Sequence, residues 1–303
     1  MHRLLILSKD AEAYRALIAA AELPGLAVVS DQSSCDLVLG EPALVAPVID
    51  RVPQVAWVQS TWAGVEPLLD PRLRRDYVLT NARGVFGGLM SEYVFAYALA
   101  HERHLFDKHD AQRSRRWDPT PHGTLRGKTI GLLGVGSIGA AIAKTARHFG
   151  MRVKGYTRSS ETSPDVDAYF HGDALAAFAS DLDYLVSVVP NTGKTRKLVD
   201  ARLIAALPPR AVFINPGRGA TVDEAALAEA LRARRIAGAV LDVFEREPLP
   251  PDHEFWTLPN VRITSHTAAL SVPEDIAPVF VDNYRRFAAG APLRYVVSFA
   301  DGY

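Results

Sequence analysis

The segment TIGLLGVGSIGAAIA constrains the fold more than any other part of this chain. A short apolar run of the kind that forms a strand leads into three glycines, Gly134, Gly136 and Gly139, and an alanine-rich run typical of a helix follows. Glycines at this spacing permit, in turn, a tight turn, close approach of the backbone to a pyrophosphate, and close packing of the helix on the strand.

A helix that starts at Ser137 and Ile138 would present unpaired N–H groups and a partial positive charge to phosphate. The alternative is a glycine turn that binds nothing. Because the strand before and the helix after the glycines are both in place, the segment predicts a dinucleotide-binding domain.

Strand and helix patterns alternate along the whole chain in two zones. Expected strands before the glycine segment are RLLIL, LAVVS, CDLVLG, VAWVQ and YVLTNA; those after it are MRVKGY, DYLVSVV, RAVFIN, IAGAVLDV and VRITS. These runs are too apolar for sheets buried on one face only, which favours parallel sheets covered by helices on both faces. We therefore predict an α/β protein with two doubly wound parallel-sheet domains.

Two segments suggest where the domains divide. The helical pattern GGLMSEYVFAYALAHERHLF runs into the polar stretch KHDAQRSRRWDPTPHG, which resembles a passage between domains. Near the end, PEDIAPVFVDNYRRFAAG predicts a helix that returns the chain to the first domain. We expect a substrate-binding domain of residues 1–97 plus 272–303 and a nucleotide-binding domain of residues 98–271.

Composition excludes several classes of protein. The 303 residues carry 34 basic and 34 acidic side chains, a balance that argues against a nucleic-acid or membrane-surface partner. No stretch is apolar for the ~20 residues that a membrane span needs. Cys35 is the single cysteine, so an intrachain disulfide is excluded and a reducing compartment is favoured. We expect a cytoplasmic protein in which Cys35 is a small buried residue.

The stretch GYTRSS ends the strand that follows the glycine helix, where an acidic residue would bind an adenosine ribose diol. Arg158 stands there instead, and it would attract a 2′-phosphate that a carboxylate repels. The hydroxyls of Thr157, Ser159 and Ser160 are further donors. A solvated loop with an incidental arginine is the alternative. The stretch predicts a preference for NADP(H), with NAD(H) still possible.

Three more motifs follow at strand ends. Arg218 lies in a Pro-Gly-rich loop after RAVFIN, Asp242 and Glu247 lie beyond IAGAVL, and His266 follows VRITS. Loops at the carboxyl ends of parallel strands line the ligand crevice of an open α/β sheet, so these residues are expected to converge. Taken singly, each of these residues could equally have a structural role.

Their chemistry fits reduction of a 2-oxo acid. Arg218 can hold a carboxylate through its planar two-donor fork and polarise the neighbouring carbonyl. His266 can give a proton to that carbonyl oxygen as hydride arrives. Glu247 beside it would favour the imidazolium and raise the histidine pKa.

In combination, G-x-G-x-x-G, INPGRGATVDEAAL, LDVFEREPLP and SHTAAL resemble the D-isomer-specific 2-hydroxyacid dehydrogenases over nearly the whole chain. The resemblance implies a flavodoxin-like substrate domain, a Rossmann nucleotide domain and an active site in the cleft between them. It also implies that Arg218 binds the substrate carboxylate, that Glu247 and His266 form the acid–base pair, and that Asp242 lies on the nicotinamide side of the cofactor.

The same resemblance assigns further contacts. Pro190 and Thr195 match the family's cofactor-contacting loop, and the backbone near Ala63 and Gly64 matches its carboxylate-binding loop, with Trp62 over the pocket or serving in packing. The family needs no metal for hydride transfer, and no Cys/His cluster is visible here. It is usually dimeric, so a homodimer is expected.

TNARGVFGGLMSEYVFAYAL is similar to the glyoxylate/hydroxypyruvate reductase A branch, which implies NADPH and small 2-oxo acids such as glyoxylate and hydroxypyruvate. Glu247 argues against formate dehydrogenase, whose histidine pairs with glutamine. Two alternatives stay open: a corepressor-like binding protein that senses the nucleotide, and a dehydrogenase of a bulkier 2-oxo acid such as phenylpyruvate.

Overall fold

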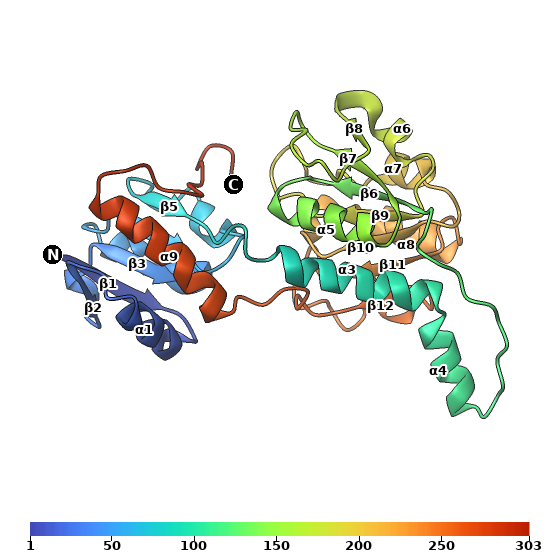
Figure 1. Ribbon diagram of the computed structural model, residues 1–303, viewed down its shortest axis with the longest axis horizontal. Coiled ribbons are helices and arrows are strands. Elements are labelled where there is room, and N and C mark those ends of the chain that lie inside the picture. Colours follow the sequence, from blue (N-terminus) through green and yellow to red (C-terminus); the bar gives the residue numbers. More distant parts are fainter. Residues whose placement is uncertain (303) are drawn as a thin grey trace. The chain divides into compact units, whose positions relative to one another are not determined.

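The computed structural model describes residues 1–302 and divides into two compact units, each an α/β domain (Figure 1). Unit 1 combines Met1–Val85 with the chain from Ser271 onward, and unit 2 is Phe86–Leu270. Both units are built on parallel sheets, so the predicted fold class is confirmed.

Unit 1 has a five-stranded sheet in the order β2-β1-β3-β4-β5, which is the flavodoxin-like order. Its strands are β1 (His2–Leu7), β2 (Leu26–Val29), β3 (Leu37–Gly40), β4 (Trp57–Ser60) and β5 (Val78–Thr80); its helices are α1 (Ala11–Ala20), α2 (Pro42–Val45) and α9 (Pro273–Ala288). Short 3₁₀ turns are η1 (Gln32–Ser34), η2 (Ile49–Arg51) and η3 (Glu66–Leu69). The predicted returning helix is α9, where Phe280 stacks on the fully buried Trp57 with 5.2 Å between ring centres.

Unit 2 has a seven-stranded parallel sheet in the order β12-β11-β10-β9-β6-β7-β8, in which the strand order reverses between β6 and β9. Its strands are β6 (Thr129–Leu133), β7 (Arg152–Tyr156), β8 (Ala168–Phe170), β9 (Tyr184–Ser187), β10 (Val212–Asn215), β11 (Gly238–Leu241) and β12 (Val261–Ile263). Its helices are α3 (Gly87–Glu102), α4 (Leu105–Arg113), α5 (Ser137–His148), α6 (Leu175–Ala179), α7 (Ala201–Ala206) and α8 (Glu224–Arg232), with 3₁₀ turns η4 (Gly172–Ala174), η5 (Gly219–Thr221) and η6 (Glu254–Thr257). This is the Rossmann order with one added strand.

The first division between units lies at Val85/Phe86, twelve residues before the predicted boundary, because α3 packs on α5. A Cβ on Gly87 would lie 2.7 Å from the Cβ of Ala141, and the Ser91 hydroxyl lies 2.9 Å from that of Thr145. A helix this closely packed belongs to the domain it touches. The second division, at Leu270/Ser271, lies one residue from the predicted one.

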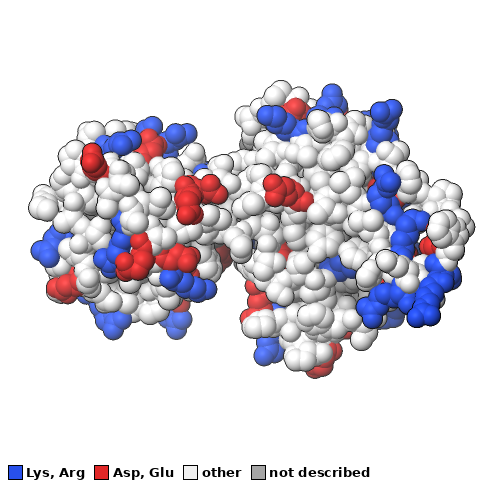
Figure 2. Space-filling model, turned by 60° about the horizontal axis from the view of Figure 1, so that its bottom comes forward, with Lys and Arg blue, Asp and Glu red and all other residues white. Residues whose placement is uncertain are grey.

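The long helical pattern after Gly87 is two helices, since His104 adopts a left-handed conformation (φ 53°) between α3 and α4. The prediction that the polar stretch passes between the domains is therefore wrong, because this stretch forms α4 and a loop within unit 2. Figure 1 draws α4 and this loop extending away from the sheet. Figure 2 shows basic side chains gathered on the same side of unit 2, a local excess that the neutral total conceals.

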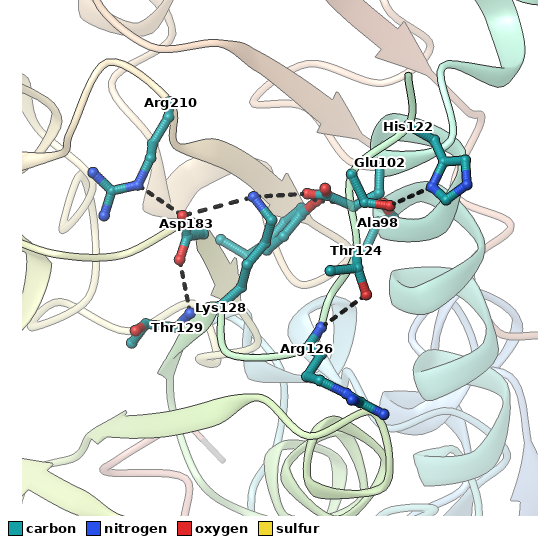
Figure 3. Close-up of polar contacts among 11 residues, drawn as sticks. Ala98, Glu102, His122, Thr124, Arg126, Lys128, Thr129, Asp183 and Arg210 are labelled. Carbon is teal, nitrogen blue, oxygen red and sulfur yellow. Dashed lines mark hydrogen bonds and ion pairs between the residues drawn. The ribbon is translucent and has the colours of Figure 1, made fainter. Parts of the chain in front are cut away.

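A network of charged side chains closes the amino-terminal end of the unit 2 sheet (Figure 3). Glu102 accepts a hydrogen bond from the Tyr184 hydroxyl at 2.5 Å and pairs with Lys128 at 3.1 Å. Asp183 accepts hydrogen bonds from the Thr129 N–H and from Arg210 Nε. Both carboxylates are buried, and each has partners of opposite charge, as buried charges require.

Cys35 is fully buried just before β3, as expected, and its thiol contacts the Gln32 carbonyl. Among residues 1–302, no helix combines the length and apolar character that crossing a bilayer demands.

Candidate active site

The glycine segment forms a turn from β6 into α5. Gly134 has a φ of +93°, which favours glycine, and a Cβ on Gly139 would lie 2.2 Å from the Gly134 carbonyl oxygen. Nothing lies within 4 Å of a Cβ built on Gly136, which caps the exposed start of α5 at Ser137. The turn thus combines one position that needs glycine's positive φ, one close contact and one open approach, which fits a pyrophosphate on the N–H groups of Ser137 and Ile138.

A cavity of about 530 Å³ opens beside this turn. Gly136, Ser137 and Lys144 lie on its α5 side, and Ser160 and Thr162–Asp165 lie on the other. The exposed Arg158 and Ser159 lie in the turn that leads from β7 into the second wall. Of the predicted 2′-phosphate residues, Ser160 lines this cavity, and the contact of Arg158 with a phosphate stays a prediction.

The sequence alone did not indicate a contact between Glu161, in this loop, and His171. His171 follows β8, the neighbour of β7, and its Nε2 lies 2.7 Å from Glu161 Oε1. The Thr157 hydroxyl donates to the Ser160 carbonyl at 2.7 Å. The contact between residues 161 and 171 depends on the pairing of β7 with β8, and no sequence motif indicates it.

The Arg218 loop follows β10 and approaches the exit of β11 closely. A Cβ on Gly219 would lie 1.9 Å from the Phe244 carbonyl carbon, so only glycine permits this approach. Asn215, the last residue of β10, contacts the loop through its side chain, and Thr221 donates to the Arg218 carbonyl at 2.6 Å. The partly buried Arg218 donates from Nη1 to Gly217 and is thereby held next to the β11 exit.

Glu247 and His266 are brought together. His266 Nδ1 lies 2.8 Å from Glu247 Oε2, and Glu247 Oε1 accepts the Phe244 N–H at 2.9 Å. His266 has a φ of +57° and donates its own N–H to the Asp242 carbonyl at 2.8 Å. Backbone contacts on both sides thus fix the pair, and the ring nitrogen that Glu247 does not use is Nε2.

The contact between Glu247 and His266 shifts the pKa of each residue in the direction that favours its charged form. The hydrogen bond that the ring donates to Glu247 raises the pKa of His266 above its ordinary value against the opposing effects of burial and of Arg218. Burial alone would raise the pKa of Glu247, but the hydrogen bonds from His266 and Phe244 and the nearby positive charges hold it below its ordinary value. Such a histidine retains its proton to higher pH than a free one.

Asp242 is buried, with 1% of its surface exposed, and both of its oxygens hold the His266 loop. Oδ1 accepts the Thr264 hydroxyl at 2.5 Å and the Thr267 N–H at 2.8 Å, and Oδ2 accepts the Ala268 N–H at 3.0 Å. This anchoring was not predicted from the sequence. A contact between Asp242 and the nicotinamide stays a prediction.

The anchor continues into α3, where the Tyr93 hydroxyl lies 2.8 Å from that of Thr264. Burial raises the pKa of Tyr93, so this hydroxyl stays protonated. The contact spans 171 positions of sequence, and no motif indicates it.

The predicted cofactor loop after β9 has a self-contained structure. The Thr195 hydroxyl donates to the Pro190 carbonyl at 2.6 Å and accepts the Thr192 N–H at 2.8 Å. The roles of Pro190 and Thr195 toward a cofactor stay predictions.

The predicted carboxylate loop, Trp62 to Gly64, follows β4 in unit 1. The Asn81 side chain donates to the Ala63 carbonyl at 2.8 Å, and the Ala82 N–H donates to the Trp62 carbonyl at 3.1 Å. Trp62 is 37% exposed, which does not support a role in the core.

Within unit 2, one end of the sheet therefore gathers the glycine turn, Arg218, Asp242, Glu247 and His266. Across residues 1–302, no group of three or more His, Cys, Asp or Glu side chains is arranged to hold a metal ion.

The two parallel sheets and the glycine turn define a two-domain dinucleotide-binding α/β protein. Residues 95–268 match the family model of the D-isomer specific 2-hydroxyacid dehydrogenase NAD-binding domain, and the chain belongs to that family. A glyoxylate/hydroxypyruvate reductase A from Serratia proteamaculans is 34% identical over 71% of this chain and 68% of its own length.

Two solved structures are similar over nearly their full lengths. A family member from Aeromonas salmonicida is 42% identical, with a TM-score of 0.93 over 98% of this chain and 99% of its own. An NADPH-dependent glyoxylate/hydroxypyruvate reductase from Sinorhizobium meliloti, solved with NADP and sulfate, is 31% identical, with a TM-score of 0.88 and full coverage of both chains. The family, the fold and the class of NAD(P)-dependent 2-hydroxyacid dehydrogenase predicted from the sequence are confirmed.

Proposed function

We propose that the protein reduces small 2-oxo acids, with glyoxylate and hydroxypyruvate as the first candidates, using NADPH. The observation that carries the proposal is the Glu247–His266 hydrogen bond at strand ends in the domain that bears the glycine turn. Support for the substrates comes from the similarity to the Serratia and Sinorhizobium reductases.

The residues present fit a nicotinamide dinucleotide, since the open approach at Gly136 and the cavity beside it leave room for one. When bound, that cofactor supplies the hydride. Arg218 holds the substrate carboxylate and orients the carbonyl. His266 donates a proton from Nε2 to the carbonyl oxygen, and the alcohol forms as carbon gains the hydride. Glu247 keeps Nδ1 protonated and stabilises the imidazolium before transfer.

The preference for NADPH rests on Arg158 and on the hydroxyls beside it. A 2′-phosphate carries close to two negative charges at neutral pH, and a guanidinium binds such a group through charge-assisted hydrogen bonds. NADH lacks this phosphate and so gains nothing from Arg158. The reductase from Sinorhizobium is described as NADPH-dependent, which supports the same preference here.

The test is absorbance at the nicotinamide band, crossing NADPH and NADH against glyoxylate, hydroxypyruvate, pyruvate and phenylpyruvate. We expect rapid oxidation of NADPH with glyoxylate and hydroxypyruvate and slower oxidation of NADH. Faster turnover of phenylpyruvate would assign a bulkier substrate. Tight nucleotide binding without oxidation by any acid would favour a nucleotide-sensing protein on this fold.

We also propose a homodimer formed through unit 2. The proposal is supported by three large apolar side chains that the α4 segment and its loop expose, Leu105 (53%), Phe106 (40%) and Trp117 (91%). Sedimentation equilibrium should report twice the chain mass of 33.0 kDa, and Trp117→Ser should shift it toward the monomer. A monomer at micromolar concentration would contradict the proposal.

A further inference from the structure

The loop that carries Arg158 also carries a carboxylate, Glu161, three residues further along. Its neighbours Ser160 and Thr162 both line the cavity beside the glycine turn. A carboxylate between two residues of this wall would repel the 2′-phosphate that Arg158 attracts, because charges act over ~10 Å at about 0.1 M salt. Glu161 thus poses a problem for the proposed cofactor preference.

The structure pairs this carboxylate with His171. His171 Nε2 lies 2.7 Å from Glu161 Oε1, and Nδ1 lies 2.8 Å from the Thr157 carbonyl oxygen. Both partners are acceptors, and a neutral imidazole has only one N–H. Nδ1 also lies 3.2 Å from the Thr157 hydroxyl, but that hydroxyl donates its proton to the Ser160 carbonyl at 2.7 Å. With the hydroxyl engaged there, both ring contacts are hydrogen bonds only when the ring carries two protons, so the geometry favours the imidazolium.

The surrounding loop is fixed by further contacts that hold this pair in place. The Thr157 N–H donates to the Phe170 carbonyl at 3.1 Å, which extends the pairing of β7 and β8 up to His171. Tyr169 stacks on His171 with 6.5 Å between ring centres, and its hydroxyl accepts the Ser163 N–H at 3.0 Å. His171 is thus anchored by β8 and reaches across to the cofactor loop.

We propose that His171 is a specificity-determining residue: as an imidazolium it neutralises Glu161, draws that carboxylate away from the cavity wall, and so permits the 2′-phosphate of NADP(H) to bind beside Arg158. The inference rests on the proposed NADPH preference and deepens it. His171 is a positioning residue, because it acts on the phosphate through Glu161 and the loop.

The test is calorimetric binding of 2′,5′-ADP and of 5′-AMP to the full-length protein, with the ratio of the two affinities as readout. His171→Gln should lower the affinity for 2′,5′-ADP about fivefold, a small effect as expected for an exposed charge pair, and leave 5′-AMP within about twofold. The double variant H171Q/E161Q should recover the wild-type ratio, since the unpaired carboxylate is gone. Glu161→Gln alone should bind 2′,5′-ADP at least as tightly as the wild type.

The matched control is His148→Gln, the same substitution in the exposed last turn of α5, at the opposite end of that helix from Gly136. It should leave both affinities unchanged. Across these variants, the KM for NADPH should rise where the affinity for 2′,5′-ADP falls, and the KM for NADH should stay nearly constant.

The ratio should also depend on pH in the wild type. The hydrogen bond to Glu161 and the Thr157 carbonyl raise the pKa of His171, so its charge persists above the ordinary range and is lost as pH rises through the raised value. Glu161 and Tyr169 face the ring, Asp173 lies two residues further along the chain, and Arg158 follows Thr157, whose carbonyl contacts the ring. From pH 7 to 9.5 the phosphate stays dianionic, so the ratio should fall in the wild type and stay flat in H171Q/E161Q.

Three results overturn the inference. If H171Q/E161Q binds 2′,5′-ADP as weakly as H171Q, Glu161 is not the group that His171 neutralises. If H171Q weakens 5′-AMP and 2′,5′-ADP equally, the ring serves only loop structure. If the wild type itself binds 2′,5′-ADP no tighter than 5′-AMP, the proposed NADPH preference fails, and the inference fails with it.

Discussion

The two ends of the unit 2 sheet use the same kinds of charged residues to opposite effect. At the amino-terminal end, Glu102 and Asp183 are buried among a lysine, an arginine, a tyrosine and backbone N–H groups (Figure 3). At the carboxyl-terminal end, the side chains of Glu247 and His266 are 36% and 53% exposed. The buried charges at the amino-terminal end stabilise the fold, whereas partial exposure at the carboxyl-terminal end leaves a protonated ring nitrogen of His266 available for chemistry.

The difference follows from what each end must satisfy. A buried carboxylate without partners costs several kcal/mol, so Glu102 is useful only as part of a complete network. A proton donor must instead reach a reacting atom, and Glu247 uses one oxygen on the Phe244 backbone and the other on His266. We therefore expect substitutions at the two ends to affect different measurements.

The largest effect is expected at the carboxyl-terminal end. His266→Ala should lower kcat ~10²–10⁴-fold, because the proton donor is lost, and should leave the Kd for the cofactor unchanged. Steady-state kinetics and fluorescence titration of the nicotinamide separate the two. Loss of cofactor binding together with turnover would instead give His266 a structural role.

Glu102→Ala should do the reverse at the amino-terminal end. It leaves Lys128 with only the more distant Asp183 and the Tyr184 hydroxyl with only the Ala98 carbonyl, and the free energy of unfolding should fall by about 3 kcal/mol. For a domain of this size, Tm should then fall by roughly 6–12 °C, with kcat for the remaining folded enzyme unchanged. Glu229→Ala, on the exposed face of α8, is the control and should change Tm by less than about 2 °C. Equal effects of the two substitutions would mean that the network adds nothing.

A smaller and more selective effect is expected at the cofactor loop. Arg158→Ala should raise the KM for NADPH about tenfold, since a charge-assisted contact is lost, and should leave the KM for NADH nearly unchanged. Arg152→Ala, at the start of β7, the strand that precedes the Arg158 turn, is the matched control. Equal losses for both cofactors would refute the assignment of Arg158 to the 2′-phosphate.

The smallest effect is a shift along the pH axis. The pKa of His266 is raised by Glu247, so the rate of reduction should be level at low pH and should fall as pH rises through that raised value. Glu247→Gln removes the carboxylate, lowers the pKa of His266, and should move this fall to lower pH. A pH profile of kcat that does not move would show that Glu247 does not tune the histidine.

Much of the fold was readable because it depends on local patterns. The glycine turn, the apolar strands of both sheets and the returning helix α9 each lie within a short window of sequence. The domain boundary was misplaced because it depends on which surface α3 packs against, and the contact of Gly87 with Ala141 is not local. The break at His104 was missed for a related reason, since the helical pattern continues through it.

The sequence by itself determined the family, the dinucleotide turn and the identity of the candidate residues Arg218, Glu247 and His266, because residue type and spacing carry that information. Only the tertiary structure decided their partners. The hydrogen bond of Glu247 to His266, the anchoring of the His266 loop by Asp242, and the pairing of Glu161 with His171 all join different strands. Parallel strands bring the ends of distant segments side by side, so contacts at a sheet edge are set by strand order and not by distance along the chain.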